Sequence, residues 1–186
     1  MLIDSDVSLS DAPSLADRIV TELRDRGLIT GDLSQECVLG GSGYHIGPAA
    51  QELYKLSPNE GHFWTLIASG VEPSIERSCN LWALSPSCEY FVCPVCNTTH
   101  ENLTGEIGDS IISAVGHWHE QNGDTEAHCT NCGKATQITE WQSKPPMGYG
   151  NLAFRFWNWP PFDASGWTLD IPQLFHDITG HTIVRS

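Results

Sequence analysis

The stretch Cys-Pro-Val-Cys at residues 93–96 and the stretch Cys-Thr-Asn-Cys at residues 129–132 decide how this chain folds. Each has the form of a zinc knuckle, in which a tight turn between two cysteines directs backbone N–H groups at sulfur. Two knuckles supply four thiolates, which complete a tetrahedral Zn²⁺ site and leave no position for water or substrate. We therefore predict a structural zinc ion held by Cys93, Cys96, Cys129 and Cys132.

Other uses of these cysteines stay open. A redox dithiol and an iron-sulfur cluster are alternatives, although cluster-binding cysteines have different spacings. A ligand set that includes His100 or His128 is also possible, but four cysteines suffice. The chain has seven cysteines, and the three outside the pairs are expected to be small buried side chains.

The paired cysteines resemble the zinc-ribbon superfamily over roughly residues 88–142. A wider resemblance, along the whole chain, is to a group of small proteobacterial proteins labelled sugar-transporter ATPases. It rests on Cys-Pro-x-Cys, the second cysteine pair, the aromatic run at 154–161 and Ile-Thr-Gly-His at 178–181. A phosphate-binding P-loop needs Gly-Lys followed by Ser or Thr. Gly133-Lys134 is followed by Ala135, so the sequence contains no P-loop.

Outside the cysteine pairs, the apolar pattern predicts helices and strands on both sides. Leu15, Ile19 and Leu23 share one face of a helix expected to run from 12 to 26 and to stop at Gly27. Further helices are expected at 106–120, at 48–56 and from the cap Asp170 to Gly180. Strands are expected at 2–9, 62–69, 81–84, 89–92, 150–159, 167–169 and 181–185, and on both sides of the second cysteine pair. The Gly40–Gly47 segment reads as a glycine-rich loop.

These elements predict an α+β fold with mixed or antiparallel sheets and a few helices. Residues 88–142 form an inserted zinc-ribbon lobe with four cysteine ligands. Residues 1–87 and 143–186 are expected to form the body. The first six residues contain two acids, unlike the basic start of a secretory signal, and no apolar run approaches the roughly 18 residues of a membrane helix. We expect a soluble bacterial protein of the cytoplasm.

The charge of the chain restricts its partners. Twenty-three acidic and nine basic side chains give a net charge of −14 at pH 7, which repels nucleic-acid backbones and anionic lipid. Residues 88–142 contain eight acids, and Lys134 is their only base. The same field attracts a basic protein, and neither nucleic acid nor a membrane is an expected partner.

Aromatic residues concentrate between 154 and 167. On a strand, Phe154 and Phe156 face one side, and Trp157 and Trp159 face the other. This pattern indicates either a central strand covered on both faces or a surface that binds a partner. Residues predicted to contact a partner are Arg155, Trp157, Trp159, Glu120, Asp124 and Glu126.

No catalytic signature is present, and no catalytic residue is predicted. The favoured hypothesis is a non-enzymatic, zinc-stabilised acidic protein that binds another protein. Its sharpest form is an immunity protein that neutralises a basic toxin, because opposite fields speed association. One alternative is an enzyme acting on a small anionic or sugar-like ligand near Gly40–Gly47, with His45 and His62. Another is a nucleic-acid-binding zinc ribbon.

Overall fold

The computed structural model describes residues 1–55, 61–80, 84, 88–101 and 103–185. The fold belongs to the α+β class, as the sequence predicted, and the strands described all pair antiparallel. The chain divides into two compact units. The body unit comprises residues 1–76 and 151–185, and the cysteine unit comprises residues 77–150.

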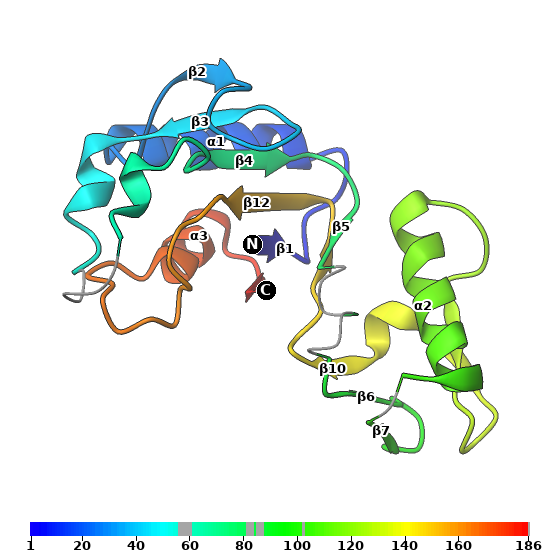
Figure 1. Ribbon diagram of the computed structural model, residues 1–186. Coiled ribbons are helices and arrows are strands. Elements are labelled where there is room, and N and C mark those ends of the chain that lie inside the picture. Colours follow the sequence, from blue (N-terminus) through cyan, green and yellow to red (C-terminus); the bar gives the residue numbers. More distant parts are fainter. Residues whose placement is uncertain (56–60, 81–83, 85–87, 102, 186) are drawn as a thin grey trace. The chain divides into compact units, whose positions relative to one another are not determined.

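The body unit is built on a six-stranded sheet (Figure 1). Its strand order is β13-β1-β12-β4-β3-β2, so β12 lies between β1 and β4 near the centre. The strands are β1 (Leu2–Asp4), β2 (Ile29–Ser34), β3 (Gly43–Ile46), β4 (Val71–Ser74), β12 (Leu152–Phe156) and β13 (Ile183–Arg185).

Two helices pack with this sheet into one core. Helix α1 (Ala12–Asp25) buries Leu15, Ile19 and Leu23 on one face, and Gly27 follows it with φ +68°. Helix α3 (Ile171–Thr179) begins after Asp170, whose carboxylate accepts the Gln173 N–H at 2.9 Å. Both helices confirm the prediction from apolar spacing and caps, because their buried faces and end residues are encoded locally.

The cysteine unit surrounds helix α2 (Gly105–Glu120) with short strands. The helix confirms the predicted segment 106–120, and Ile111 and Val115 are fully buried in the core of this unit with Phe91 and Ile138. The other elements are β5 (Ser78–Cys79), β6 (Tyr90–Val92), β7 (Thr99–His100), β8 (Glu126–His128), β9 (Ala135–Gln137), η4 (Ile138–Glu140), β10 (Gln142–Lys144) and β11 (Tyr149–Gly150).

The cysteine unit is inserted in the chain between two paired strands of the body. Strands β4 and β12 pair directly, with Ser74 opposite Ala153. The first and last strands of the insertion also pair with each other, with Ser78 opposite Gly150 and Cys79 opposite Tyr149. Because β5 and β11 belong to it, this compact unit extends beyond the expected range 88–142 on both sides.

Several predicted elements differ in the structure. Residues 62–69 contain the 3₁₀ turn η2 (Phe63–Thr65) instead of a strand. Within the described part of the expected helix 48–56, which ends at residue 55, the one helical element is the 3₁₀ turn η1 (Pro48–Gln51). Part of the Gly40–Gly47 segment is strand β3, and at 167–169 Trp167 makes an isolated bridge to Tyr54. The expected strand 81–84 falls largely outside the described residues.

Two predicted strands are shorter than their apolar pattern suggested. Strand β1 stops at Asp4 because its carboxylate accepts the N–H groups of Asp6 and Val7, which turns the chain. Strand β12 stops at Phe156, and Asn158 follows with φ +57°. In the part of the chain that the structure describes, no helix combines the length and the apolarity needed to cross a membrane.

Candidate metal centre

The first cysteine pair lies in a hairpin turn between β6 and β7. The Cys93 N–H donates to the Thr98 carbonyl at 3.0 Å, and the Asn97 N–H donates to the Cys93 carbonyl at 3.0 Å. Asn97 has φ +57°, a left-handed conformation that asparagine tolerates better than most residues. This turn brings Cys96 back toward Cys93.

The second pair repeats the same turn between β8 and β9. The Cys129 N–H donates to the Lys134 carbonyl at 2.9 Å, and the Gly133 N–H donates to the Cys129 carbonyl at 2.8 Å. Gly133 takes the left-handed position with φ +68°. The strands flanking this pair confirm the sequence prediction.

The two knuckles bring their four sulfur atoms together. The Sγ atoms of Cys93 and Cys132 are 4.0 Å apart, and those of Cys96 and Cys129 are 3.7 Å apart. All four lie within 4.8 Å of one another. A tetrahedron with metal–sulfur bonds of about 2.3 Å has edges of about 3.8 Å. The four cysteines can therefore hold a metal ion.

Neighbouring side chains stabilise the thiolate form of Cys96. The Thr98 hydroxyl hydrogen-bonds its Sγ at 3.2 Å, and Asn131 Nδ2 reaches the same sulfur at 3.7 Å from the other knuckle. The bond with Thr98 is the main reason that the pKa of Cys96 falls to about 5. Cys93 is buried, and burial raises the pKa of its thiol. A bound cation opposes that effect, because metal ligation requires the thiolate.

His100 lies beside the four cysteines. Its Nε2 is 3.4 Å from Cys129 Sγ, and its ring lies 5.9 Å from the Trp141 ring. Trp141 is itself fixed, since its indole N–H donates to Thr136 Oγ1 at 2.9 Å. Sequence reasoning treated His100 as an alternative ligand, and the structure places it within hydrogen-bonding distance of the Cys129 sulfur. His128 is exposed.

Sequence reasoning also missed Thr98 and Asn131 as partners of Cys96. The sequence contains only a weak indication of these contacts. Thr98 stands two residues after Cys96, and Asn131 stands between the two cysteines of the second pair. Asn131 Nδ2 also donates to Thr98 Oγ1 at 2.9 Å, so one amide links both knuckles.

The three acids predicted to contact a partner lie at the end of α2, in the turn that follows and at the start of β8. Glu120 accepts from Asn122 Nδ2 at 3.0 Å, and the Asp124 carboxylate accepts the Glu126 N–H at 3.0 Å. The turn is held to the helix because His117 Nδ1 lies 2.8 Å from the Asp124 carbonyl. Glu120 and Asp124 are exposed, and Glu126 is half-buried.

The other three predicted contact residues lie in the body unit. Arg155 is exposed, lies 5.3 Å from the centre of the Trp157 ring and forms an ion pair with Glu72 at 3.4 Å. Trp157 is half-buried, and its indole N–H donates to Glu72 at 2.8 Å. Trp159 is buried, with its indole N–H bonded to the Ser69 carbonyl at 2.6 Å. Trp159 is therefore part of the core and has no free ring face to offer a partner.

The expectation about the remaining cysteines is partly met. Cys37 and Cys79 are buried, and Cys88 is half-buried. Burial raises the pKa of Cys79 to about 11. A thiol with such a pKa stays protonated at neutral pH, which suits a packing role.

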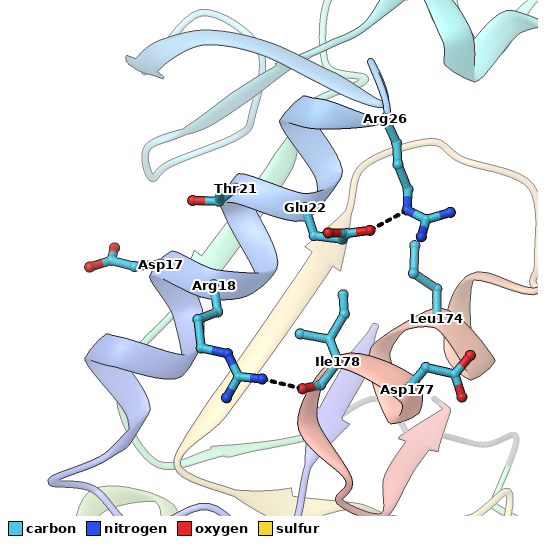
Figure 2. Close-up of a pocket in the computed structure, with 8 residues that line it drawn as sticks. All are labelled: Asp17, Arg18, Thr21, Glu22, Arg26, Leu174, Asp177 and Ile178. Atoms are coloured by element: carbon cyan, nitrogen blue, oxygen red, sulfur yellow. Dashed lines mark hydrogen bonds and ion pairs between the residues drawn. The ribbon is translucent and has the colours of Figure 1, made fainter.

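A groove between α1 and α3 in the body unit is lined by charged side chains (Figure 2). Figure 2 shows Arg18 reaching from α1 to the Ile178 carbonyl in the last turn of α3, at 2.6 Å. Arg26 pairs with Glu22 at 2.7 Å on its own helix. Arg18 satisfies a carbonyl at a helix C-terminus, where a cation is favoured. These two cations thus have partners within the fold, and the groove is a helix-packing feature.

A second hollow in the body unit, the aromatic pocket, has a volume of about 490 Å³. It includes His62, whereas His45 lies on β3 opposite Thr30 and does not line it. The two histidines considered for an enzyme therefore do not share this pocket. Its lining is Tyr54, Gly61, His62, Phe63, Thr65, Leu66, Asn158, Pro160, Pro161 and Ala164.

Comparison of the chain with protein-family models, curated proteins and solved structures gives no match. The likeness to zinc ribbons and to the proteobacterial group stays a prediction. The site must accordingly be interpreted from its own geometry.

Proposed function

We propose that the four cysteines bind one Zn²⁺, which acts as a structural ion. The cross-knuckle distances of 3.7 and 4.0 Å match the edges of a zinc-thiolate tetrahedron. Four sulfur ligands leave no open position for substrate. Zinc would tie two small hairpins together in a unit whose strands have only two or three residues.

We further propose that the cysteine unit carries an acidic surface that binds a cationic protein. Residues 77–150 contain eight acids and three bases, and seven of the acids are exposed. Among the described residues of this unit, the one ion pair joins Lys144 to Glu89 at 2.9 Å. Arg77 donates to the Trp118 carbonyl at 3.1 Å and lies 5.3 Å from the centre of its ring.

The uncompensated carboxylates are the observation that carries this proposal. Glu120, Asp124 and Glu126 accept hydrogen bonds from neutral groups, which hold the carboxylates in place without cancelling their charge. A fixed cluster of charge gives fast, salt-dependent association with a surface of opposite sign. A basic toxin is the partner class that best suits a small acidic chain with no catalytic signature, so an immunity-type antagonist is the proposed role.

Capture of a partner tests this role. The zinc-loaded chain is immobilised, retained proteins from the source cells are identified by mass spectrometry, and the main partner is purified for calorimetry. We expect a basic partner whose Kd rises steeply with salt concentration. Co-expression is the second arm: the partner alone arrests growth of a host, and the full chain restores growth.

Two triple variants, each of which neutralises three acidic side chains of the cysteine unit, compare the proposed binding surface with a control surface. The turn variant carries Glu120→Gln, Asp124→Asn and Glu126→Gln, and the control carries Glu101→Gln, Glu106→Gln and Asp109→Asn. We expect the turn variant to raise Kd by about tenfold or more, and the control to raise it by less. Equal losses in both variants, salt-independent binding, or an acidic partner surface would each reject the proposal.

A further inference from the structure

The aromatic pocket of the body unit has the size and walls of a small-molecule site. Its volume of about 490 Å³ falls within the range of about 300–1,000 Å³ typical of ligand pockets. Tyr54 and Phe63 contribute rings to the wall, and two consecutive prolines, Pro160 and Pro161, form another part. The ten described lining residues all belong to the body unit, whereas the four paired cysteines and Glu120, Asp124 and Glu126 belong to the cysteine unit.

The described part of the lining is uncharged, in contrast to the rest of the chain. Of the residues that the structure describes, ten line the pocket, and none of these is Asp, Glu, Lys or Arg, although the chain has 32 such residues. His62 is the one histidine among them. A carboxylate or an ammonium group would lose its hydration here without gaining a charged partner, which is costly. The pocket therefore favours an uncharged ligand.

The polar side chains of the lining are mostly used by the protein itself. Thr65 Oγ1 donates to the His62 carbonyl at 2.7 Å, and Asn158 Nδ2 donates to the Ala68 carbonyl at 2.7 Å. A sugar has many hydroxyl groups, each of which needs a partner when buried. Among the lining residues that the structure describes, the His62 ring and the Asn158 side-chain carbonyl oxygen can serve a ligand. One or two polar groups on an otherwise apolar molecule suit it better than a polyol.

The aromatic wall is held rigidly from behind. The Phe63 ring lies 5.4 Å from Trp159 and 6.2 Å from Tyr54, and the Tyr54 ring lies 5.1 Å from Trp167. Edge-to-face and tilted contacts of this kind fix ring orientation. Tyr54 and Phe63 are only 6 % and 4 % exposed, so a flat ring that enters the pocket makes an edge contact with the small part of this wall that is accessible.

Leu66 is an apolar side chain of the pocket wall that is half exposed to solvent. Leu66 is 50 % exposed and lines the pocket, and its neighbour Ile67 is 88 % exposed but does not line it. A ligand in the pocket covers apolar surface of Leu66, which contributes to binding by removing that surface from water. The pair also provides a variant and its control at adjacent positions.

We propose that the aromatic pocket binds an uncharged small molecule with a flat aromatic ring system and one or two polar groups. The ring packs against Tyr54, Phe63 and the Pro160-Pro161 wall, and its polar group meets His62 or Asn158. This binding is independent of the acidic surface and of the zinc ion.

The experiment titrates four probes into the full zinc-loaded chain and follows backbone amide shifts by NMR and heat by calorimetry. The probes are 2-naphthol, 2-naphthoate, 2-naphthylmethylammonium and decahydro-2-naphthol. We expect 2-naphthol to shift the backbone amides of residues 61–66, 158–159 and 162–164 with a submillimolar Kd. Both charged probes and the saturated probe bind about tenfold or more weakly.

Two variants locate the binding. Leu66→Asp places a charge in the wall at an exposed position that folding tolerates, and Kd for 2-naphthol rises about tenfold or more. Ile67→Asp carries the same charge outside the lining and leaves Kd within about twofold. Absence of shifts with 2-naphthol, a preference for the cationic probe, equal binding of the saturated probe, or equal effects of the two variants would each overturn the proposal.

Discussion

The Sγ of Cys96 lies 3.7 Å from the Sγ of Cys129, although 33 positions separate these residues in the chain. The distance joins one knuckle to the other. A metal ion at this point therefore cross-links the β6–β7 hairpin to the β8–β9 hairpin.

Loss of one metal ligand is expected to unfold the cysteine unit. The free energy of metal binding to a structural four-ligand site is on the order of 10 kcal/mol and is coupled to folding. We expect one zinc per chain by elemental analysis of the purified protein. Cys132→Ser loses this zinc and the cooperative urea transition of the cysteine unit. Cys88→Ser, at a half-buried cysteine outside the cluster, keeps both; retention of zinc by Cys132→Ser contradicts the assignment.

Removal of His100 is expected to weaken the metal site without abolishing it. Its Nε2 lies 3.4 Å from Cys129 Sγ, and loss of such an outer hydrogen bond typically costs about 10–100-fold in metal affinity. Competition with a chelator measures this for His100→Ala, and the cobalt-substituted protein reports the change in its sulfur-to-metal absorption bands. His128→Ala is the control because that side chain is exposed. An unchanged affinity in His100→Ala would show that the contact has no role.

Two glycines of α2 are expected to respond oppositely to alanine. A Cβ on Gly108 would collide with the backbone carbonyl of Leu103, whereas a Cβ on Gly116 meets nothing within 4 Å. Gly108→Ala should lower the unfolding free energy by about 1–3 kcal/mol. Gly116→Ala should raise it by up to about 1 kcal/mol, because alanine restricts the unfolded chain and favours helix. Urea unfolding of the zinc-loaded protein measures the unfolding free energy of both variants. A lower unfolding free energy for Gly116→Ala would contradict the open space found at this position.

Stability is expected to fall between pH 9 and pH 11 because of Cys79. Burial raises the pKa of its thiol from 9.0 to about 11 in the folded state. Over this window the unfolded chain releases the proton and the folded chain retains it, so rising pH favours unfolding. The stabilisation from the protonated Cys79 thiol is fully present below pH 9. Two pKa units correspond to about 2.7 kcal/mol, and screening by solvent reduces this to about 1–2 kcal/mol.

The pH dependence is measured by urea unfolding in reductant at several pH values. Cys79→Ala should show a shallower decline than the parent chain. Cys88→Ala, at a less buried thiol, should change the slope less. Parallel curves for the parent and Cys79→Ala would exclude this origin of the pH dependence.

Local patterns in the sequence predicted the helices well. Leu15, Ile19 and Leu23 recur with helical spacing, and Gly27 and Gly180 mark the ends where the left-handed conformation is needed. The knuckles were equally predictable, because ligand spacing within four residues is a local property.

The strands were less predictable. Gly43 lies in strand β3, where a Cβ would meet the Val71 carbonyl at 2.8 Å, so this glycine serves close strand packing and not a loop. Trp159 illustrates the same difficulty. The alternating pattern placed it within a strand at 150–159 and left open whether its ring was buried or faced a partner, whereas the strand ends at Phe156 and the turn at Asn158 sends the ring into the core.

The sequence by itself determined the two cysteine pairs, the amphipathic helices and the excess of acidic charge, since each depends on residue type and short spacing. Tertiary structure alone decided that β4 and β12 pair around the insertion. It also decided which side chains surround the cysteine sulfur atoms, namely Thr98, Asn131 and His100. Finally, it placed Tyr54 and Phe63 in one pocket with Pro160. These relationships join residues far apart in the chain, and long-range packing, which leaves little periodic signal, brings them together.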